Sequence, residues 1–160
     1  MRAVLQRVLS AEVRIASEKD MDLSGMPVSG KISKGLLVLA GFVPEDTDGD
    51  LEWIAKKILS MRIFDDDEGV MNKSLLDISG EILVVSQFTL LASTKKGNRP
   101  SYIRAARGEI SSPLYDRFLD MVSAMSGKKA GRGVFGADMK VSLVNDGPVT
   151  IILDSKEKDF

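Results

Sequence analysis

The sequence predicts a single domain in which β-strands combine with two main helices. Its 160 residues are enough to bury one hydrophobic core, and no shift in composition divides the chain. Hydrophobic residues at 44% and charged residues at 28% are typical of a globular protein and exclude disordered and collagen-like classes. Apolar runs with the spacing of strands are interrupted by two segments with the spacing of amphipathic helices. We therefore expect one domain over residues 1–160.

The expected strands differ in how their apolar residues are spaced. They cover residues 2–15, 36–42, 81–90, 139–143 and 149–153. The first strand alternates apolar and polar side chains, with a bend near Ser10, whereas the second and third are continuous apolar runs typical of buried strands. Within the alternating first strand, Arg7 by itself indicates a solvent-facing side chain.

Each expected helix begins at a capping signal. Thr47 caps the first helix, with Asp50 three residues later and an apolar stripe behind it. Ser112 and Pro113 supply the N-cap and the first-turn proline of the second helix, which Gly127 ends. Both apolar stripes predict packing against the core.

The connecting segments carry few signals of chemistry. Residues 17–30 predict a long inserted hairpin connection, and residues 154–160 are expected to form a frayed tail. The consecutive carboxylates at residues 65–68 predict a solvated hairpin turn, because they lack the alternating spacing of a calcium loop. Residues 145–148 also predict a hairpin turn, since Asp-Gly favours positive φ.

Cysteine and histidine are both absent, which excludes much enzyme chemistry. The chain cannot provide a cysteine nucleophile, a Ser-His-Asp triad, a histidine base or a Cys/His zinc site. We expect no metal and no cofactor. Because the net charge is −1, any nucleic acid must be bound by a local basic patch. No apolar run is long enough to span a bilayer and no signal peptide is recognisable, so we expect a cytoplasmic protein.

Polar residues at the far end of the third strand mark a candidate site. Ser86, Gln87 and Thr89 follow its apolar residues, and a polar, basic segment with Gly97 and Pro100 comes next. Polar side chains at the mouth of a rigid strand beside a loop are a common way to build a site. The alternative is an ordinary strand end whose hydroxyls are bonded to the backbone.

Pro148 fits poorly into a simple hairpin turn. A proline that opens a strand removes a backbone donor, which is tolerated at the first residue of a strand or at an edge. Another structural requirement at this position is therefore expected.

Two motifs are the most specific features of the chain: Ser86-Gln87-Phe88-Thr89-Leu90 and Asn145-Asp146-Gly147-Pro148-Val149-Thr150. Together they resemble the D-aminoacyl-tRNA deacylase family, of the D-tyrosyl-tRNA deacylase type. Similar stretches follow in order along nearly the whole chain: Met1-Arg2-Ala3-Val4-Leu5-Gln6-Arg7-Val8, Lys34-Gly35-Leu36-Leu37-Val38, Lys96-Gly97-Asn98-Arg99-Pro100 and Phe135-Gly136-Ala137-Asp138-Met139. The main departure from the family is the long connection at residues 17–30.

The resemblance implies a compact α+β fold with a largely antiparallel or mixed, barrel-like sheet and two main helices. It implies a homodimer that hydrolyses the ester between a D-amino acid and the 3′ adenosine of tRNA, and so proofreads chirality in translation. It implies no metal, no DNA partner and no membrane. The Gly147–Pro148 bond would be cis and would enter the partner subunit's pocket, opposite the Ser86 to Thr89 motif.

The expected site residues fall into three groups by role. The catalytic motif comprises Ser86, Gln87, Phe88 and Thr89. Chirality across the subunit interface is assigned to Arg7, Asn145, Gly147, Pro148 and Val149, with Arg7 holding the Gly-Pro carbonyls. The terminal adenosine and the tRNA phosphates are assigned to Phe135, Gly136, Ala137, Met139, Lys95, Lys96 and Arg99.

An aminoacyl ester is already activated, so the enzyme mainly needs to position a nucleophile and stabilise the oxyanion. Backbone amides near Phe88 and Thr89 are expected to act as the oxyanion donors. Thr89 as a covalent nucleophile would need an adjacent base, so a water assisted by the ribose 2′-hydroxyl fits this chain better. A wall made by the backbone of Gly147 and Pro148 would exclude L side chains and accept glycine, which makes glycyl-tRNA mischarged on tRNA-Ala a further expected substrate.

Two alternatives remain open from the sequence. One is a relative with a trans Gly-Pro bond that edits L-aminoacyl-tRNA, although Arg7 favours the cis form. The other is a non-catalytic dimer that recognises the tRNA end.

Overall fold

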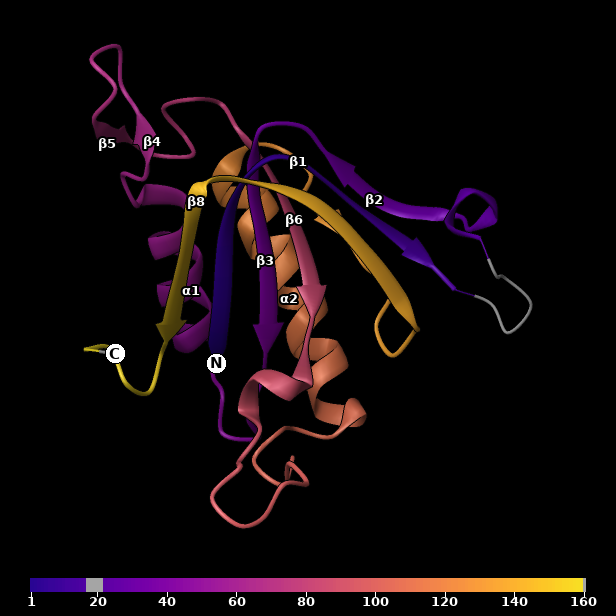
Figure 1. The fold of residues 1–160 in the computed structure, drawn as a ribbon. Coiled ribbons are helices and arrows are strands. Elements are labelled where there is room, and N and C mark those ends of the chain that lie inside the picture. The colour runs from indigo at the N-terminus through magenta and orange to yellow at the C-terminus, as the bar shows by residue number, and fades with distance from the viewer. Residues whose placement is uncertain (17–21, 160) are drawn as a thin grey trace.

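The computed structural model describes residues 1–16 and 22–159, which form a mixed sheet, a small two-stranded sheet and two long helices (Figure 1). In chain order the elements are β1 (Arg2–Ile15), η1 (Leu23–Gly25), β2 (Val28–Ile32), β3 (Gly35–Gly41), α1 (Asp48–Ser60), β4 (Phe64–Asp65), β5 (Met71–Lys73), β6 (Glu81–Ser86), η2 (Phe88–Leu91), α2 (Gly108–Ser126), β7 (Gly131–Arg132) and β8 (Met139–Asp154). Antiparallel and parallel pairs share the main sheet. The expected α+β class with two main helices is confirmed.

Strand β1 organises the sheet, because it pairs with β2, β3 and β8. Residues 2–8 of β1 run antiparallel to β3, and residues 11–14 run antiparallel to β2. β8 pairs along the opposite side of β1, while β3, β6 and β7 are joined in parallel. β1 therefore changes partner near Ser10, where the sequence predicted a bend.

The sheet curves until β2 approaches β7, which makes it a nearly closed barrel. A Cβ atom added at Gly30 of β2 would lie 2.6 Å from the carbonyl oxygen of Arg132 in β7, so this approach requires glycine. The apolar interior is formed by Val8, Ala11, Val13, Ile32, Leu37, Leu83 and Val85. Side chains that alternate along the strands point either into this barrel or toward the helices.

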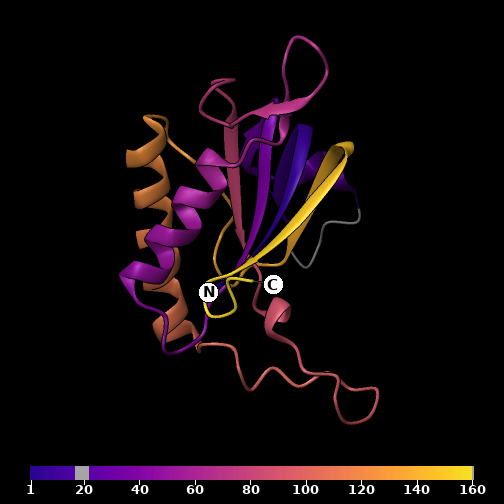
Figure 2. The same ribbon diagram turned by 90° about the vertical axis from the view of Figure 1, so that its left-hand side faces the viewer.

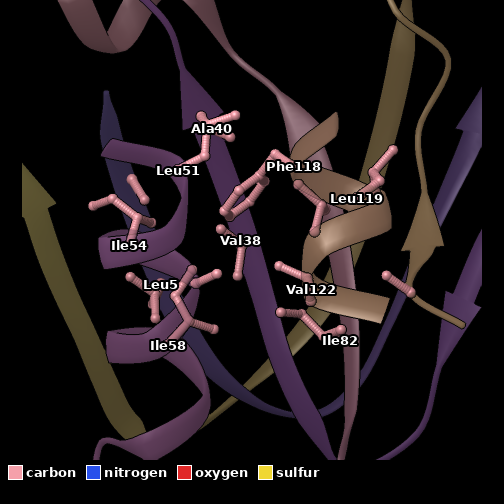
Figure 3. Packing of buried hydrophobic residues seen from close by; sticks show 14 of the residues in the cluster. Leu5, Val38, Ala40, Leu51, Ile54, Ile58, Ile82, Phe118, Leu119 and Val122 are labelled. Atoms are coloured by element: carbon pink, nitrogen blue, oxygen red, sulfur yellow. The ribbon is translucent and has the colours of Figure 1, made fainter. Parts of the chain in front are cut away.

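Both helices cover the same outer face of the sheet (Figure 2). The side chains that meet between the layers include Leu5, Val38 and Ile82 from the strands, Leu51, Ile54 and Ile58 from α1, and Phe118, Leu119 and Val122 from α2 (Figure 3). Burying each such side chain contributes about 1.5–3 kcal/mol. The predicted cap of α1 is present, because the Asp50 carboxylate accepts hydrogen bonds from the Thr47 amide and hydroxyl at 2.9 and 2.8 Å.

The third strand is shorter than predicted. Pairing between β6 and β3 ends at Ser86, because β3 itself ends at Gly41, and the 3-10 helix η2 follows at Phe88–Leu91. The apolar character of the chain continues past Ser86, so composition does not reveal where the pairing stops. The polar residues of the motif therefore lie on a turn rather than on the strand itself.

The second helix begins earlier than predicted. α2 starts at Gly108, so Pro113 lies inside the helix and Ser112 is not its N-cap. A proline removes only one helical hydrogen bond this close to the start, and the buried Leu114 and Tyr115 hold the turn against the core. Its predicted end is confirmed, because Gly127 is the C-cap with a left-handed φ of 70°.

Residues 145–148 do not form the predicted hairpin turn, because β8 continues through them. Val8 of β1 pairs with Asn145 and Gln6 pairs with Thr150, so residues 146–149 face a single residue of β1. This excess of residues is a β-bulge, whose members leave the hydrogen-bonded ladder. Pro148 is tolerated there because the bulge does not require its missing amide donor.

The C-terminal segment is better held than predicted. Asp154 is still part of β8, and Arg2 pairs with its carboxylate at 2.8 Å. The Ser155 amide donates to the Met1 carbonyl oxygen at 2.9 Å, and both Asp154 and Ser155 are buried. The Lys156 ammonium then pairs with an α1 carboxylate at 2.8 Å. Residues 154–156 are therefore anchored rather than frayed, and residue 160 lies outside the described part of the chain.

Two other connections were predicted, the acidic turn at residues 65–68 and the long connection at residues 17–30. The Asp66 carboxylate accepts hydrogen bonds from the Glu68 and Val70 amides, both at 3.0 Å, which confirms the acidic hairpin turn. In the long connection, residues 28–30 already belong to β2, and residues 17–21 lie outside the described part of the chain.

Candidate active site

A pocket of about 420 Å³ lies where the parallel strands β3 and β6 end. Ala40 of β3 is paired with Ser86 of β6, so the segments that follow both strands emerge at the same edge. Sheets commonly bind ligands at the carboxyl ends of parallel strands. The pocket is lined by Ala40, Gly41, Phe42, Val85, Ser86, Gln87, Phe88, Ala106, Gly108, Ser111, Phe135, Gly136, Ala137, Asp138, Met139 and Val141.

The motif after β6 presents unpaired polar groups beside this pocket. The Gln87 amide donates to the Ala40 carbonyl oxygen at 2.8 Å, which fixes the chain as it leaves the strand. The next two amides, of Phe88 and Thr89, have no acceptor in the described part of the chain. The Ser86 hydroxyl also has no partner among residues 1–16 and 22–159, whereas the Gln87 side-chain amide donates to the Thr89 hydroxyl. Two backbone donors and one hydroxyl are therefore available to a ligand.

Residues 135–139 form the opposite wall, which rests on a buried tyrosine. The Phe135 ring packs on Tyr115 with 6.1 Å between centroids, and the Tyr115 hydroxyl donates to the Val84 carbonyl oxygen at 2.8 Å. Burial raises the pKa of Tyr115 to about 12, so its hydroxyl stays neutral. The Asp138 carboxylate is paired with an ammonium at 2.8 Å. The pocket therefore contains no unpaired acid that resembles a general base.

The Gly147–Pro148 segment lies at the other end of the sheet from this pocket (Figure 1). Through successive strand pairs, Asn145 is level with Glu81 at the start of β6. Ser86 lies at the far end of that strand, roughly 17 Å away at roughly 3.3 Å per residue. A single chain therefore keeps the two predicted motifs apart.

Arg7 is buried rather than solvent-facing as the local pattern predicted. Its Nε donates to the Asp146 carbonyl oxygen at 3.0 Å, and its Nη1 donates to the Ile63 carbonyl oxygen at 2.7 Å. The guanidinium also pairs with the carboxylates of Asp65 and Asp146 at 3.2 and 3.3 Å. The resemblance implied that Arg7 holds the Gly-Pro carbonyls. Within this chain Arg7 instead binds the carbonyl oxygen of Asp146, the residue before Gly147.

Gly147 and Pro148 are exposed at the surface of the chain. Gly147 has a φ of +125°, and an added Cβ atom would lie 3.0 Å from Arg7 Nη2, so no other residue fits without strain. The Val149 amide donates to the Asn145 side-chain oxygen at 3.2 Å, which closes the bulge. The Gly147–Pro148 peptide bond is cis, as the resemblance implied. The five residues predicted to set chirality are therefore one contiguous feature.

The basic segment after η2 forms a loop, hereafter the basic loop, closed by Ser93 and Ser101. Their backbone groups exchange hydrogen bonds at 2.8 and 2.9 Å. Lys95, Lys96 and Arg99 are exposed on the loop, and none has an ion-pair partner in the described part of the chain. The loop extends away from the sheet near the pocket end of β6 (Figures 1 and 2).

The structure brings together most of the predicted pocket residues and adds others. Ser86, Gln87, Phe88, Phe135, Gly136, Ala137 and Met139 line the pocket, whereas Thr89 lies beside it against Gln87. The lining residues that the sequence did not predict are Ala40, Gly41, Phe42, Val85, Ala106, Gly108, Ser111, Asp138 and Val141. Residues 40–42 reach the pocket through the parallel pairing of β3 with β6, Ser111 reaches it from α2, and Val141 reaches it from β8. No local sequence pattern predicts these neighbours.

Other kinds of site find little support in residues 1–16 and 22–159. No three acidic side chains there are grouped so that they could hold a metal ion. None of the helices described has the length and apolarity needed to cross a membrane.

Comparisons with known proteins agree with this architecture. The family model described as D-Tyr-tRNA(Tyr) deacylase matches residues 4–154. A protein of Dechloromonas aromatica (strain RCB) named D-aminoacyl-tRNA deacylase is 56% identical over 156 residues and covers 98% of each chain. A protein of Bacteroides thetaiotaomicron with the same name is 55% identical and covers 99% of this chain and 100% of its own.

Two solved structures share the fold. One, titled c-Myc DNA Unwinding Element Binding Protein, has a TM-score of 0.84 and 39% identity and covers 96% of this chain and 98% of its own. The other, titled as a probable eukaryotic D-amino acid tRNA deacylase, has a TM-score of 0.78 at 20% identity with the same coverage. The full-length match to the family model and to relatives above 50% identity is decisive. The chain belongs to the D-Tyr-tRNA(Tyr) deacylase family.

Proposed function

We propose that the protein hydrolyses the ester that joins a D-amino acid to the 3′ adenosine of tRNA, and thereby proofreads chirality in the cytoplasm. This proposal rests on the two backbone amides of Phe88 and Thr89, which have no acceptor in the described part of the chain and lie beside the pocket. The pocket lining offers no side chain that could act as a general base, because its one carboxylate, Asp138, is paired with an ammonium. Such a site suits an ester that needs oxyanion stabilisation more than it needs an activated nucleophile.

The two amides act as the oxyanion donors in this mechanism. Each donor contributes roughly 10²–10³ in rate when it is aimed at the developing negative charge. A water, assisted by the neighbouring 2′-hydroxyl of the terminal ribose, attacks the ester carbonyl. The bond between the carbonyl carbon and the 3′-oxygen then breaks, and the 3′-oxygen takes up the proton that the water loses, which leaves free amino acid and tRNA. The Thr89 hydroxyl, held by the Gln87 side-chain amide, positions these groups by hydrogen bonding. The Ser86 hydroxyl is available to the substrate's polar groups.

The rest of the pocket accommodates the terminal nucleoside. Phe135, Gly136, Ala137 and Met139 form a largely apolar wall against which an adenine ring packs. The Lys95, Lys96 and Arg99 side chains contact phosphates farther along the acceptor end, which fixes orientation without reading sequence. No metal or cofactor takes part.

Chirality requires a second copy of the chain in this proposal. Gly147 and Pro148 lie at the far end of the sheet from their own pocket, and they are exposed in a bulge whose Asp146 carbonyl oxygen is bonded to Arg7. In a homodimer, each bulge enters the partner's pocket and places backbone atoms where an L side chain would lie.

The outer edge of β8 supports such a dimer. β8 pairs only with β1 among the described strands, so its other edge is free, and long free edges in proteins are usually covered. Val144 and Ile152 on β8 are 52% and 42% exposed, and Leu9 of the neighbouring strand is 53% exposed. A second copy would cover these apolar side chains.

A hydrolysis assay tests the proposal. Sub-stoichiometric protein is incubated with tRNA charged with a D-amino acid, the matching L-amino acid, or glycine, including glycyl-tRNA-Ala. We expect turnover of the D-aminoacyl and glycyl esters and none of the L-aminoacyl ester, because a backbone wall rejects by stereochemistry and glycine offers nothing to reject. Turnover of the L ester alone would identify an L-editing enzyme, and tRNA binding without turnover would identify a non-catalytic dimer.

A further inference from the structure

An exposed aromatic pair, hereafter the aromatic corner, lies at the mouth of the pocket. The Phe88 and Tyr102 rings are 5.0 Å apart between centroids and inclined at 77°. Phe88 is 56% exposed and Tyr102 39% exposed, although large aromatic side chains are usually buried. The Tyr102 hydroxyl has no hydrogen-bond partner in the described part of the chain. Neither the core nor the proposed catalytic motif explains why two aromatic rings are left exposed here.

The aromatic corner joins the pocket to the basic loop. Phe88 lines the pocket, whereas Tyr102 does not. Tyr102 directly follows Ser101, one of the two residues that close the basic loop. A ligand chain that leaves the pocket toward Lys95, Lys96 and Arg99 therefore has the aromatic corner along its path.

The charged residues of the chain segment that carries Tyr102 have a single sign. Residues 93–108 contain five basic residues and no acidic residue. In addition to the three cations of the basic loop, Arg104 and Arg107 are exposed and have no ion-pair partner among residues 1–16 and 22–159. Many of the other basic side chains described, such as Arg132 and Lys140, are paired with carboxylates. This region is therefore complementary to a polyanion that also carries flat apolar surfaces.

We propose that the aromatic corner is a stacking subsite for the base of the nucleotide that precedes the 3′ adenosine. This inference rests on the proposed function, because it takes a tRNA acceptor end as the ligand. The pocket receives the terminal nucleoside with its aminoacyl group, and the preceding unpaired base stacks on the Tyr102 ring while its edge faces Phe88. The phosphates beyond it then meet the basic loop.

Stacking suits this position for a physical reason. Proteins bind single-stranded nucleic acid by combining a basic surface with aromatic rings, because every base has a π-face and an aromatic side chain loses little entropy on binding. Two rings at a steep angle form a corner that holds a base by its face and its edge together. The terminal ester is thereby oriented before it reaches the oxyanion donors.

The test compares three substitutions of Tyr102 with one matched control. Removing a base–aromatic stack typically weakens binding by about 10-fold or more, so we expect Tyr102→Ala to raise KM for D-aminoacyl-tRNA about 10-fold with little change in kcat. Tyr102→Phe keeps the ring and retains wild-type KM, whereas Tyr102→Leu behaves like Tyr102→Ala. Ile103→Ala removes an equally local apolar side chain that is 88% exposed but has no ring, and it leaves KM unchanged.

Changes in the substrate identify the contacted nucleotide. On tRNA that carries an abasic residue before the 3′ adenosine, the KM of the wild-type protein rises by the same factor. The KM of Tyr102→Ala does not rise further on this tRNA, because the two changes remove one contact. On a D-aminoacyl ester of adenosine alone, wild type and Tyr102→Ala are equal. Lys96→Ala and Arg99→Ala weaken binding to intact and abasic tRNA alike and each lower the salt slope by about one.

Some outcomes would overturn the stacking subsite. If Tyr102→Ala raised KM equally on the adenosine ester, Tyr102 would support the pocket itself rather than bind the preceding base. A wild-type KM for Tyr102→Leu on tRNA would show that no ring is needed. The dissociation constant of uncharged tRNA, intact and abasic, decides the inference even if no ester is hydrolysed. Failure of the proposed function would instead appear as absence of D-aminoacyl turnover by the wild-type protein.

Discussion

Thr89 is one of two hydroxyl residues in the proposed catalytic motif, and its only described side-chain partner is the Gln87 amide. A threonine without an adjacent base is a weak nucleophile, whereas its hydroxyl can still orient water or substrate. We expect Thr89→Val to lower kcat about 100-fold, the cost of misplacing reacting groups, without any acyl-enzyme forming. Thr89→Ser keeps the hydroxyl and retains most of the activity. Mass spectrometry of quenched wild-type reactions checks the mechanism, since aminoacyl-Thr89 would contradict it.

Tyr115 provides a second prediction for a single residue. Its hydroxyl donates to the Val84 carbonyl oxygen, which also accepts from the Gly133 amide at 3.0 Å, so Tyr115→Phe leaves that carbonyl paired. We expect the substitution to lower the free energy of unfolding by about 1 kcal/mol at neutral pH, as for one typical hydrogen bond. Urea denaturation measures the change.

The raised pKa of Tyr115 also predicts how stability changes in alkali. Burial raises the pKa of the Tyr115 phenol from 10.0 to about 12. Below pH 10 the phenol is protonated in the folded and the unfolded chain alike, so stability is unaffected. As the pH rises from 10 toward 12 the unfolded chain loses this proton first, and the free energy of unfolding falls. Tyr115→Phe removes this part of the pH dependence. Tyr102→Phe, which alters an exposed ring, serves as the control and leaves it in place. Identical alkaline slopes for the wild type and Tyr115→Phe would contradict the prediction.

At the scale of elements, the end of β8 depends on Asp154. Burial alone would raise the pKa of Asp154, but hydrogen bonds from the Lys156 amide and the Arg2 guanidinium outweigh it and hold the pKa below the ordinary value of 3.8. A lowered pKa means that the carboxylate stabilises the fold above pH 3.8 and that this contribution is lost as pH falls through the folded-state pKa.

Asp154→Asn tests this anchor. We expect the variant to be less stable than the wild type at pH 7 and the difference to shrink as the pH is lowered below about 4, because the wild-type carboxylate is then protonated. Asp120→Asn, at an exposed position of α2 without an ion pair in the described residues, is the matched control. A difference from wild type that is constant between pH 7 and pH 2 would show that the Asp154 charge does not matter.

At the scale of the whole molecule, the separation of the two motifs predicts complementation between subunits. Thr89→Val damages the pocket of its own chain, and Gly147→Ala strains the bulge, because Gly147 has a φ of +125° and an added Cβ would crowd Arg7. A heterodimer of the two variants would contain one pocket with both defects and one with neither. We expect it to recover about half of the wild-type activity, as two-fold symmetry requires.

Purification with two different affinity tags isolates that heterodimer for the assay. If each pocket used its own Gly147, both pockets of the heterodimer would carry one defect and no activity would return. Sedimentation of the wild-type protein provides the control, since a monomer at assay concentration would contradict the proposed exchange of residues.

The candidate site was only partly predictable from the sequence. The residues that the sequence motifs marked as site residues and that line the pocket are Ser86, Gln87, Phe88, Phe135, Gly136, Ala137 and Met139, and their roles there stay a prediction. Residues 40–42 and Ser111 were missed because β3, β6 and α2 bring them to the pocket only through tertiary pairing. The boundary errors at Ser86 and Gly108 have the same origin, since the partner strand and the core decide where each element ends.

The sequence by itself determined the chemistry open to this protein. The lack of cysteine and histidine excludes cysteine nucleophiles and histidine bases, and periodicity places the core strands and two helices with boundary errors of a few residues. Only the tertiary structure decided the role of Arg7 and the form of the Gly147–Pro148 segment. Hydrogen bonds between β1 and β8 join residues more than a hundred positions apart, and that pairing buries Arg7 and turns an apparent hairpin into a bulge. A local pattern contains no information about such a partner, because strand pairing is chosen by the whole chain.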